Sequence, residues 1–216
     1  MAQVYCLTFN PFQENTYVVA DASGECVIID PGCFGREEQA ELSRFISENR
    51  LTPVKLLNTH CHIDHVLGNY FVAKTWNLKL ETHREERSNL ERMVNYGHLF
   101  GVEGIEQSPE PQVWLEEGMQ VNFGETVLDV LFVPGHSAGH IAFVDKKQKM
   151  VIGGDVLFQG SIGRTDLPGG DFHTLIKSIK TKLFPLGDDY VIYPGHGPET
   201  TIGEERKFNP FCGEKV

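Results

Sequence analysis

Apolar residues at the start of the chain gather in short β-prone runs that turn-forming residues separate, as in a β-meander. These runs cover residues 4–9, 16–20 and 26–29. Apolar positions then recur at helical spacing, with charges between them, over residues 36–50. The first part of the chain therefore predicts three strands followed by an amphipathic helix.

The remainder of the chain alternates between the same two kinds of pattern. The expected strands are 54–58, 79–82, 112–115, 119–123, 126–132, 141–144, 150–152 and 190–193, and the expected helices are 66–76, 85–96, 172–183 and 204–208. Residues 97–111 form a loop rich in Gly, Pro and Glu that is long for a compact domain. The chain thus has strands followed by helices, and then strands followed by helices again. This order predicts an α/β protein in which two sheets pack together and the helices lie outside them.

Composition narrows the class of protein. A chain of 216 residues without repeats or a disordered linker predicts a single domain over 1–216. Its formal charge of −11 disfavours binding to nucleic acid or to an anionic membrane surface, because both need clustered Lys and Arg. No apolar run approaches the ~18 residues of a membrane span. The N-terminus has no basic segment, and the five cysteines form no Cys-x-x-Cys pair, so we expect a cytoplasmic protein.

Three histidines and one aspartate lie within six residues, directly after the strand expected at 54–58. On an extended backbone His60 and His62 point to the same side. Asp64 and His65 follow in the turn, where the chain can curl back over the same space. Imidazole and carboxylate groups together suit a divalent transition metal, whereas calcium and magnesium prefer oxygen ligands. The motif therefore predicts a metal site.

Three more candidate ligands follow expected strands and stand next to glycine. They are His136 in Pro-Gly-His, Asp155 in Gly-Gly-Asp and His196 in Pro-Gly-His-Gly. Glycine lets the backbone turn sharply and brings the next side chain out at a sheet edge. With the four residues of the first motif they make seven ligands, enough for two metal ions with positions left for water.

In their order and spacing these motifs resemble the metallo-β-lactamase-fold hydrolases, and the resemblance covers nearly the whole chain. It includes Asp30-Pro31-Gly32. It implies an αββα sandwich of two mixed sheets, with the site at one edge. It also implies that His60, His62 and His136 bind one metal, that Asp64, His65 and His196 bind the second, and that Asp155 bridges both.

Two metal ions about 3.5–4 Å apart can hold a hydroxide at neutral pH, polarise a carbonyl and stabilise an oxyanion. Asp64 is the candidate catalytic residue, because it can orient that nucleophile. Zinc is the favoured metal, and iron or manganese also suits His-rich sites with carboxylates.

Within the superfamily, residues 133–140, 160–167 and 206–211 resemble the glyoxalase II branch, and more closely its short single-domain bacterial relatives. This resemblance implies a hydroxyacylglutathione hydrolase activity, in which the metal-bound hydroxide cleaves thioesters of the S-lactoylglutathione type. The chain ends at Val216, so we expect no C-terminal helical domain of the kind that binds glutathione in full-length glyoxalase II.

Four residues are expected around the metal ligands. Arg164 and Lys207 are candidates to pair with carboxylates of the substrate, although each also suits a surface ion pair. His140 is expected to support the site as a donor or to pack beside it, and Asp30 to orient a ligand or to cap its own turn. Cys61 should face away from its two histidine neighbours and be buried.

Other functions share parts of this pattern. A mononuclear iron persulfide dioxygenase of the same fold would use His60, His136 and Asp155 and also carries the Gly-Arg-Thr-Asp stretch. A β-lactamase, a lactonase and a non-catalytic metal-binding protein are further alternatives. The leading expectation is a small-molecule thioester substrate without nucleic-acid or membrane partners. The sequence carries no signal for an oligomeric state.

Overall fold

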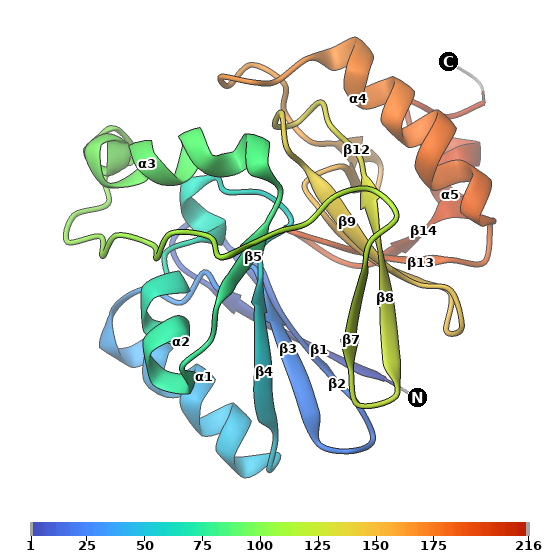
Figure 1. The fold of residues 1–216 in the computed structure, drawn as a ribbon. Coiled ribbons are helices and arrows are strands. Elements are labelled where there is room, and N and C mark those ends of the chain that lie inside the picture. Colours follow the sequence, from blue (N-terminus) through green and yellow to red (C-terminus); the bar gives the residue numbers. More distant parts are fainter. Residues whose placement is uncertain (1, 215–216) are drawn as a thin grey trace. The chain divides into compact units, whose positions relative to one another are not determined.

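The computed structural model describes residues 2–214, apart from the side chains of residues 99 and 100. By its internal contacts the chain forms two compact units. The N-terminal unit comprises Met1–Leu115 and Asn122–Thr126, and the C-terminal unit comprises Glu116–Val121 and Val127–Val216. Figure 1 shows strands and helices in both units. The single domain expected over 1–216 stays a prediction.

The N-terminal unit is built on a six-stranded sheet of order β1-β2-β3-β4-β5-β6. Its strands are β1 (Gln3–Phe9), β2 (Glu14–Ala20), β3 (Glu25–Ile29), β4 (Thr52–Leu57), β5 (Leu80–Thr82) and β6 (Val113–Trp114). The first three strands pair antiparallel, as expected of a meander, and the last four pair in parallel. Parallel neighbours need a crossover connection, and each crossover contains a helix.

The helices of this unit supply the other side of its core. They are α1 (Gly35–Glu48), α2 (Asn69–Trp76) and α3 (Arg87–Tyr96), with 3₁₀ turns η1 (Ile63–His65), η2 (Arg84–Glu86) and η3 (Gly97–Phe100). Leu42 and Ile46, one turn apart on α1, and Val72 on α2 pack with Ile28 and Leu56 of the sheet. The apolar stripe predicted for residues 36–50 therefore contains the buried residues of α1.

A second six-stranded sheet has the order β14-β13-β10-β9-β8-β7. Its strands are β7 (Gln120–Phe123), β8 (Thr126–Phe132), β9 (Ile141–Asp145), β10 (Met150–Gly154), β13 (Val191–Pro194) and β14 (Thr200–Thr201), and a separate ribbon joins β11 (Leu157–Phe158) to β12 (Ser161–Ile162). β10 and β13 are parallel, whereas β10–β9, β9–β8 and β13–β14 are antiparallel. The two-residue strands β11, β12 and β14 were not predicted.

The helices of the C-terminal unit are α4 (Phe172–Ser178) and α5 (Ile202–Phe208), and a π-helix η4 (Ile179–Leu183) and a 3₁₀ turn η5 (Phe184–Leu186) extend α4. Leu175, Ile179 and Ile202 pack with Val151 and Ile192 of the sheet. The helix predicted over 172–183 is thus present, but it winds more widely from Ile179 onward.

The helix predicted over 66–76 begins three residues later than expected, at Asn69. The preceding turn is tied to a distant one, because the amide of Gly68 donates to the carbonyl of Pro31 at 2.7 Å. A Cβ at Gly68 would lie 2.5 Å from Sγ of Cys33, so only glycine permits this approach. A contact between positions 31 and 68 therefore delays the helix, and no local pattern encodes it.

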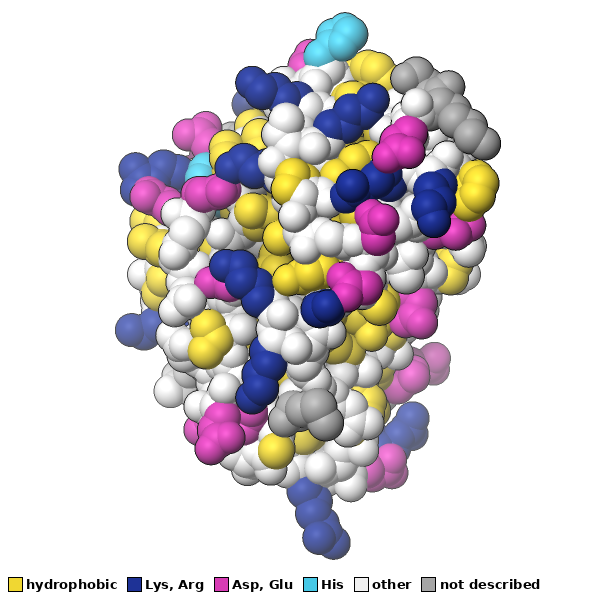
Figure 2. Space-filling view, turned by 90° about the vertical axis from the view of Figure 1, so that its right-hand side faces the viewer, with side chains coloured by type: hydrophobic (Ala, Val, Ile, Leu, Met, Phe, Trp, Pro, Cys, Tyr) yellow, Lys and Arg dark blue, Asp and Glu magenta, His cyan; other side chains and the backbone are white. Residues whose placement is uncertain are grey.

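Acidic and basic side chains are interspersed over the face of the molecule that Figure 2 shows. This mixture agrees with the modest excess of 30 acidic over 19 basic residues in the chain. Within residues 2–214, no helix combines the length and the apolar character that crossing a membrane requires. All five cysteines are free thiols, and Cys61 is buried as expected.

Candidate metal centre

The first histidine motif forms a tight cluster in the N-terminal unit, where the chain leaves β4. The imidazole rings of His60 and His62 are 4.8 Å apart between centroids, and those of His60 and His65 are 4.2 Å apart. Oδ2 of Asp64 lies 3.8 Å from Nε2 of His65. The 3₁₀ turn η1 curls the chain back as the sequence predicted, so all four candidate ligands of this unit gather in one place.

Asp30 directly follows β3, and its carboxylate contacts this cluster at His65. Its Oδ1 accepts hydrogen bonds from the amide of Thr59 at 2.7 Å and from Nδ2 of Asn58 at 3.2 Å. Its Oδ2 accepts from the hydroxyl of Thr59 and lies 3.2 Å from Nδ1 of His65. The φ angle of Asp30 is +50°, a left-handed conformation that Asp tolerates better than most residues. Asp30 thus contacts a candidate ligand, as one of its two expected roles requires.

A second carboxylate beside His65 was not predicted. Glu14 lies on β2, where every residue is buried, and its Oε1 is 3.8 Å from Nδ1 of His65. Burial raises the pKa of the Glu14 carboxyl well above its usual range, the imidazole of His65 lowers it, and the carboxylate of Asp30 raises it further. Glu14 falls between the β-prone runs expected at 4–9 and 16–20, where nothing in the sequence signals burial, so only the structure could reveal this residue.

The other three candidate ligands meet in the C-terminal unit. His136 follows β8, Asp155 follows β10 and His196 follows β13, each at the strand end that the sequence indicated. Oδ2 of Asp155 lies 3.6 Å from Nε2 of His136 and 3.6 Å from Nε2 of His196. One carboxylate oxygen of Asp155 therefore lies equally far from an imidazole nitrogen of each of the two histidines.

Backbone groups fix the tautomers of two histidines in this unit. Nδ1 of His136 is 2.8 Å from the carbonyl oxygen of Arg164, which can only accept, so Nδ1 carries the proton and Nε2 offers its lone pair. Nε2 of the buried His140 accepts from the amide of Asp155 at 3.0 Å. His140 was expected to support the site as a donor or to pack beside it, and which of these roles it has toward a metal ligand stays a prediction. It supports the main chain of Asp155 as an acceptor.

The backbone of Gly163 lies close to two candidate ligands, His136 and Asp155. A Cβ at this position would lie 1.9 Å from the carbonyl oxygen of Asp155 and 3.0 Å from Nδ1 of His136. The amide of Gly163 also donates to the carbonyl of Val156. The absence of a side chain therefore lets the 163–164 backbone pass directly beneath His136 and Asp155.

The two candidate substrate-binding residues are both exposed in the C-terminal unit. Arg164 forms a bidentate ion pair with Asp166, with Nε–Oδ1 and Nη2–Oδ2 distances of 2.7 and 2.8 Å. This pairing lowers the pKa of Asp166 to about 2. Lys207 lies on the exposed side of α5. Its role and that of Arg164 toward a substrate stay predictions.

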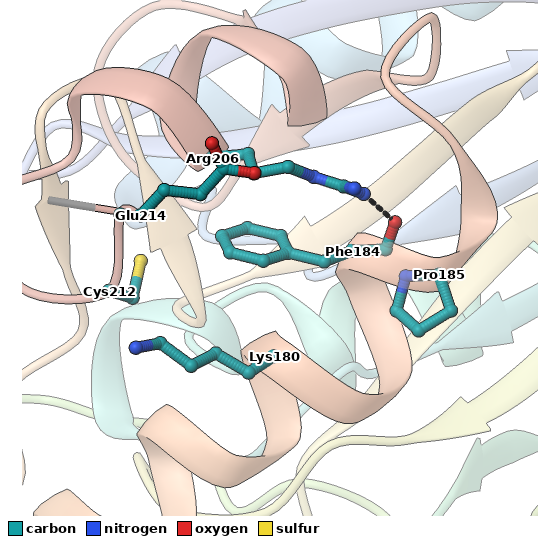
Figure 3. A pocket seen from close by; sticks show the side chains of 7 residues that line it. Lys180, Phe184, Pro185, Arg206, Cys212 and Glu214 are labelled. Carbon is teal, nitrogen blue, oxygen red and sulfur yellow. Dashed lines mark hydrogen bonds between the residues drawn. The ribbon is translucent and has the colours of Figure 1, made fainter.

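A cavity of about 330 Å³ opens beside α5, and its walls include Lys180, Phe184, Arg206 and Cys212 (Figure 3). Arg206 donates to the carbonyl of Phe184 and lies 3.1 Å from Asp188. Burial raises the pKa of the Cys212 thiol to about 12. None of the residues that line this cavity is a candidate metal ligand, so the cavity is distinct from the histidine clusters.

The chemistry of the clustered donors suits a divalent transition metal. In the N-terminal unit, ligand atoms of Asp30, His60 and His65 all lie within 4.8 Å of one another, and all three side chains are buried. In the C-terminal unit, one carboxylate oxygen faces two imidazole nitrogens. Neutral imidazole with carboxylate is a ligand set that zinc, iron and manganese share.

Comparison with known proteins identifies the family. The profile of the metallo-beta-lactamase superfamily matches residues 9–196. The hydroxyacylglutathione hydrolase GloC of Haemophilus influenzae is 38% identical over 209 residues, which are 94% of this chain and 95% of that protein. Two solved structures share the fold. The B3 metallo-beta-lactamase BLEG-1 has a TM-score of 0.88 at 34% identity, covering 97% of this chain and 99% of that one. TTHA1623 in a di-iron-bound form has a TM-score of 0.86 at 39% identity, covering 96% and 99%.

The chain therefore belongs to the metallo-beta-lactamase superfamily, and the α/β fold expected from its sequence is confirmed. Because this superfamily consists of metallo-hydrolases, its membership supports an enzymatic role for the chain. The matched segment includes all seven candidate ligands, from His60 to His196.

Proposed function

We propose that this protein is a glyoxalase-II-like thioesterase that hydrolyses S-lactoylglutathione-type thioesters with two divalent metal ions. The observation that carries the proposal is the position of Asp155, whose Oδ2 lies 3.6 Å from Nε2 of His136 and 3.6 Å from Nε2 of His196. A carboxylate in this position suits a bridge between two metals. The name of the GloC relative supports the choice of thioester.

In this proposal His60, His62 and His136 hold one metal, and Asp64, His65 and His196 hold the second. Asp155 belongs to both sets. Zinc is the proposed metal, and the di-iron form of the TTHA1623 relative makes iron the first alternative. Two bound metal ions supply a water nucleophile of lowered pKa and polarise the thioester carbonyl.

The residues of the chain position these groups. The carbonyl of Arg164 holds the proton on Nδ1 of His136, which keeps Nε2 available as a ligand. Asp30 faces His65 in the same way from the N-terminal unit. Asp64, beside His65, is the proposed catalytic residue that orients the nucleophile. Ligands held in this way need little reorganisation when they bind metal.

Arg164 and Lys207 are the proposed contacts to the carboxylates of the glutathione-type substrate. Both are exposed cations in the C-terminal unit. The guanidinium of Arg164 is held in a fixed direction by Asp166, and a guanidinium held in this way presents its remaining donors to an anion. Neither a nucleic acid nor a membrane is part of the proposal, and five free thiols suit the reducing conditions of the cytoplasm.

Metal analysis of the protein as purified, paired with an S-lactoylglutathione hydrolysis assay, tests the proposal. Two metal ions per chain and turnover of this thioester are the expected results. One iron per chain, oxygen uptake with glutathione persulfide and no thioester cleavage would instead establish the dioxygenase alternative. Hydrolysis of a β-lactam in place of the thioester would move the activity toward that of the BLEG-1 relative. A fully metallated protein without any turnover would contradict an enzymatic role.

A further inference from the structure

Glu14 has the features of a residue that serves a neighbouring ligand. Its side chain is fully buried in the N-terminal unit. Oε2 accepts a hydrogen bond from the hydroxyl of Thr16 at 2.9 Å. Oε1 has no hydrogen-bond partner among the residues that the structure describes, and it lies 3.8 Å from Nδ1 of His65.

The turn at Gly32 fits closely against this carboxylate. A Cβ on Gly32 would lie 2.1 Å from Oε2 of Glu14 and 2.7 Å from the carbonyl oxygen of Asp64. Nδ2 of Asn10 donates to the carbonyls of both Gly32 and Asp64, each at 3.0 Å. Glu14 is therefore packed against the same turn that supports the backbone of Asp64.

A buried carboxylate is unfavourable unless a positive or strongly donating group faces it. The donor beside Oε1 is the imidazole of His65, whose Nδ1 also lies 3.2 Å from Oδ2 of Asp30. A metal ion on the opposite ring nitrogen, Nε2, would draw electron density from the ring and make Nδ1–H a stronger donor. Histidines that bind metal commonly direct their other nitrogen at a carboxylate for this reason.

We propose that Glu14 is a positioning residue for the second metal, which acts with Asp30 to hold the His65 ring so that Nε2 faces the metal. This inference rests on the two-metal function proposed above. In this arrangement two carboxylates face the same nitrogen, Nδ1 of His65. Oδ2 of Asp30 lies 3.2 Å from it and Oε1 of Glu14 lies 3.8 Å from it.

The proposal is tested by isothermal titration calorimetry, in which Zn²⁺ is added to protein made metal-free with a chelator. Glu14→Gln keeps the shape of the side chain and removes its charge. The matched control is Glu205→Gln, which alters another buried glutamate that is hydrogen-bonded to Thr200 and Gly160. We expect Glu14→Gln to weaken the second Zn²⁺ site about 10- to 100-fold and to leave the first unchanged. Glu205→Gln should leave both affinities unchanged.

A purely structural role would alter the stability of the metal-free protein without favouring one site over the other. Urea unfolding of both variants, with and without Zn²⁺, therefore accompanies the titration. If Glu14→Gln does not fold, Glu14→Asp keeps the charge but withdraws the carboxylate by one methylene, and the same selective loss is expected. Two Zn²⁺ ions bound by the variant with wild-type affinities would overturn the role of Glu14 alone. A wild-type protein that binds one Zn²⁺ would overturn the two-metal function itself.

Discussion

Replacing Gly163 with alanine tests how the ligands of the C-terminal unit are held. The new Cβ would lie 1.9 Å from the carbonyl oxygen of Asp155 and 3.0 Å from Nδ1 of His136. An ordinary contact begins at 3.4 Å, so the two backbones must separate by about 1.5 Å. Both neighbours, Asp155 and His136, are candidate metal ligands. Making room for the new Cβ would therefore displace at least one of them.

A misplacement of about 1 Å in a catalytic site costs on the order of 100-fold in rate. We therefore expect Gly163→Ala to lower kcat/KM for S-lactoylglutathione by about 100-fold or more, which is about 2.7 kcal/mol of transition-state stabilisation. Metal content should fall with it. The measurements are steady-state hydrolysis kinetics and metal analysis of the same preparation.

Gly160→Ala is the control, because Gly160 has a φ of +66° but nothing within 4 Å of its Cβ position. It should cost about 1–2 kcal/mol of folding stability through backbone strain and leave metal content and turnover unchanged. Wild-type kinetics and metal content in Gly163→Ala would refute the positioning role of the close contact. Equal losses in both variants would show that the effect is not specific to the close contact at Gly163.

Three further predictions concern the ligands, the substrate contact and acid stability. Asp155→Ala should abolish binding of both metals, whereas His65→Ala should chiefly weaken the second. Metal analysis that finds two ions in Asp155→Ala would contradict the bridge. Arg164→Ala should raise KM for an anionic thioester about tenfold and lower kcat less. The pKa of Asp166, followed by NMR, should rise from about 2 in the same variant, and an unchanged KM would remove Arg164 from the substrate site. The Thr126 hydroxyl and the Ser23 amide hold the pKa of Asp21 below its usual range. Asp21 therefore stabilises the fold above about pH 4. Urea unfolding should show that Asp21→Asn is less stable than wild type at pH 7, with a difference that shrinks as pH falls below about 4, and a pH-independent difference would contradict this assignment.

Local pattern was enough to predict most elements of both units. The meander β1–β3 and the amphipathic helix α1 appear where their apolar spacing indicated. The exceptions have physical causes that lie outside the local sequence. α2 begins late because the Gly68 amide is bound to Pro31, and β11, β12 and β14 have two residues each.

The proximity of the candidate ligands within each unit was predictable, because these side chains directly follow strands in the sequence. His60 and His62 are two positions apart, so their proximity follows from backbone geometry alone. His136, Asp155 and His196 each follow a strand end, and the order of strands brings Asp155 between the other two.

The sequence by itself determined the kind of chemistry, because seven His and Asp residues at strand ends restrict the chain to a metal site of a recognisable family. Only the tertiary structure decided what holds those ligands. Glu14 meets His65 across 51 positions, and the carbonyl of Arg164 meets His136 across 28. Such contacts depend on how strands and turns pack, and residue type and periodicity do not encode them. The support of the candidate metal ligands is therefore a property of the folded units.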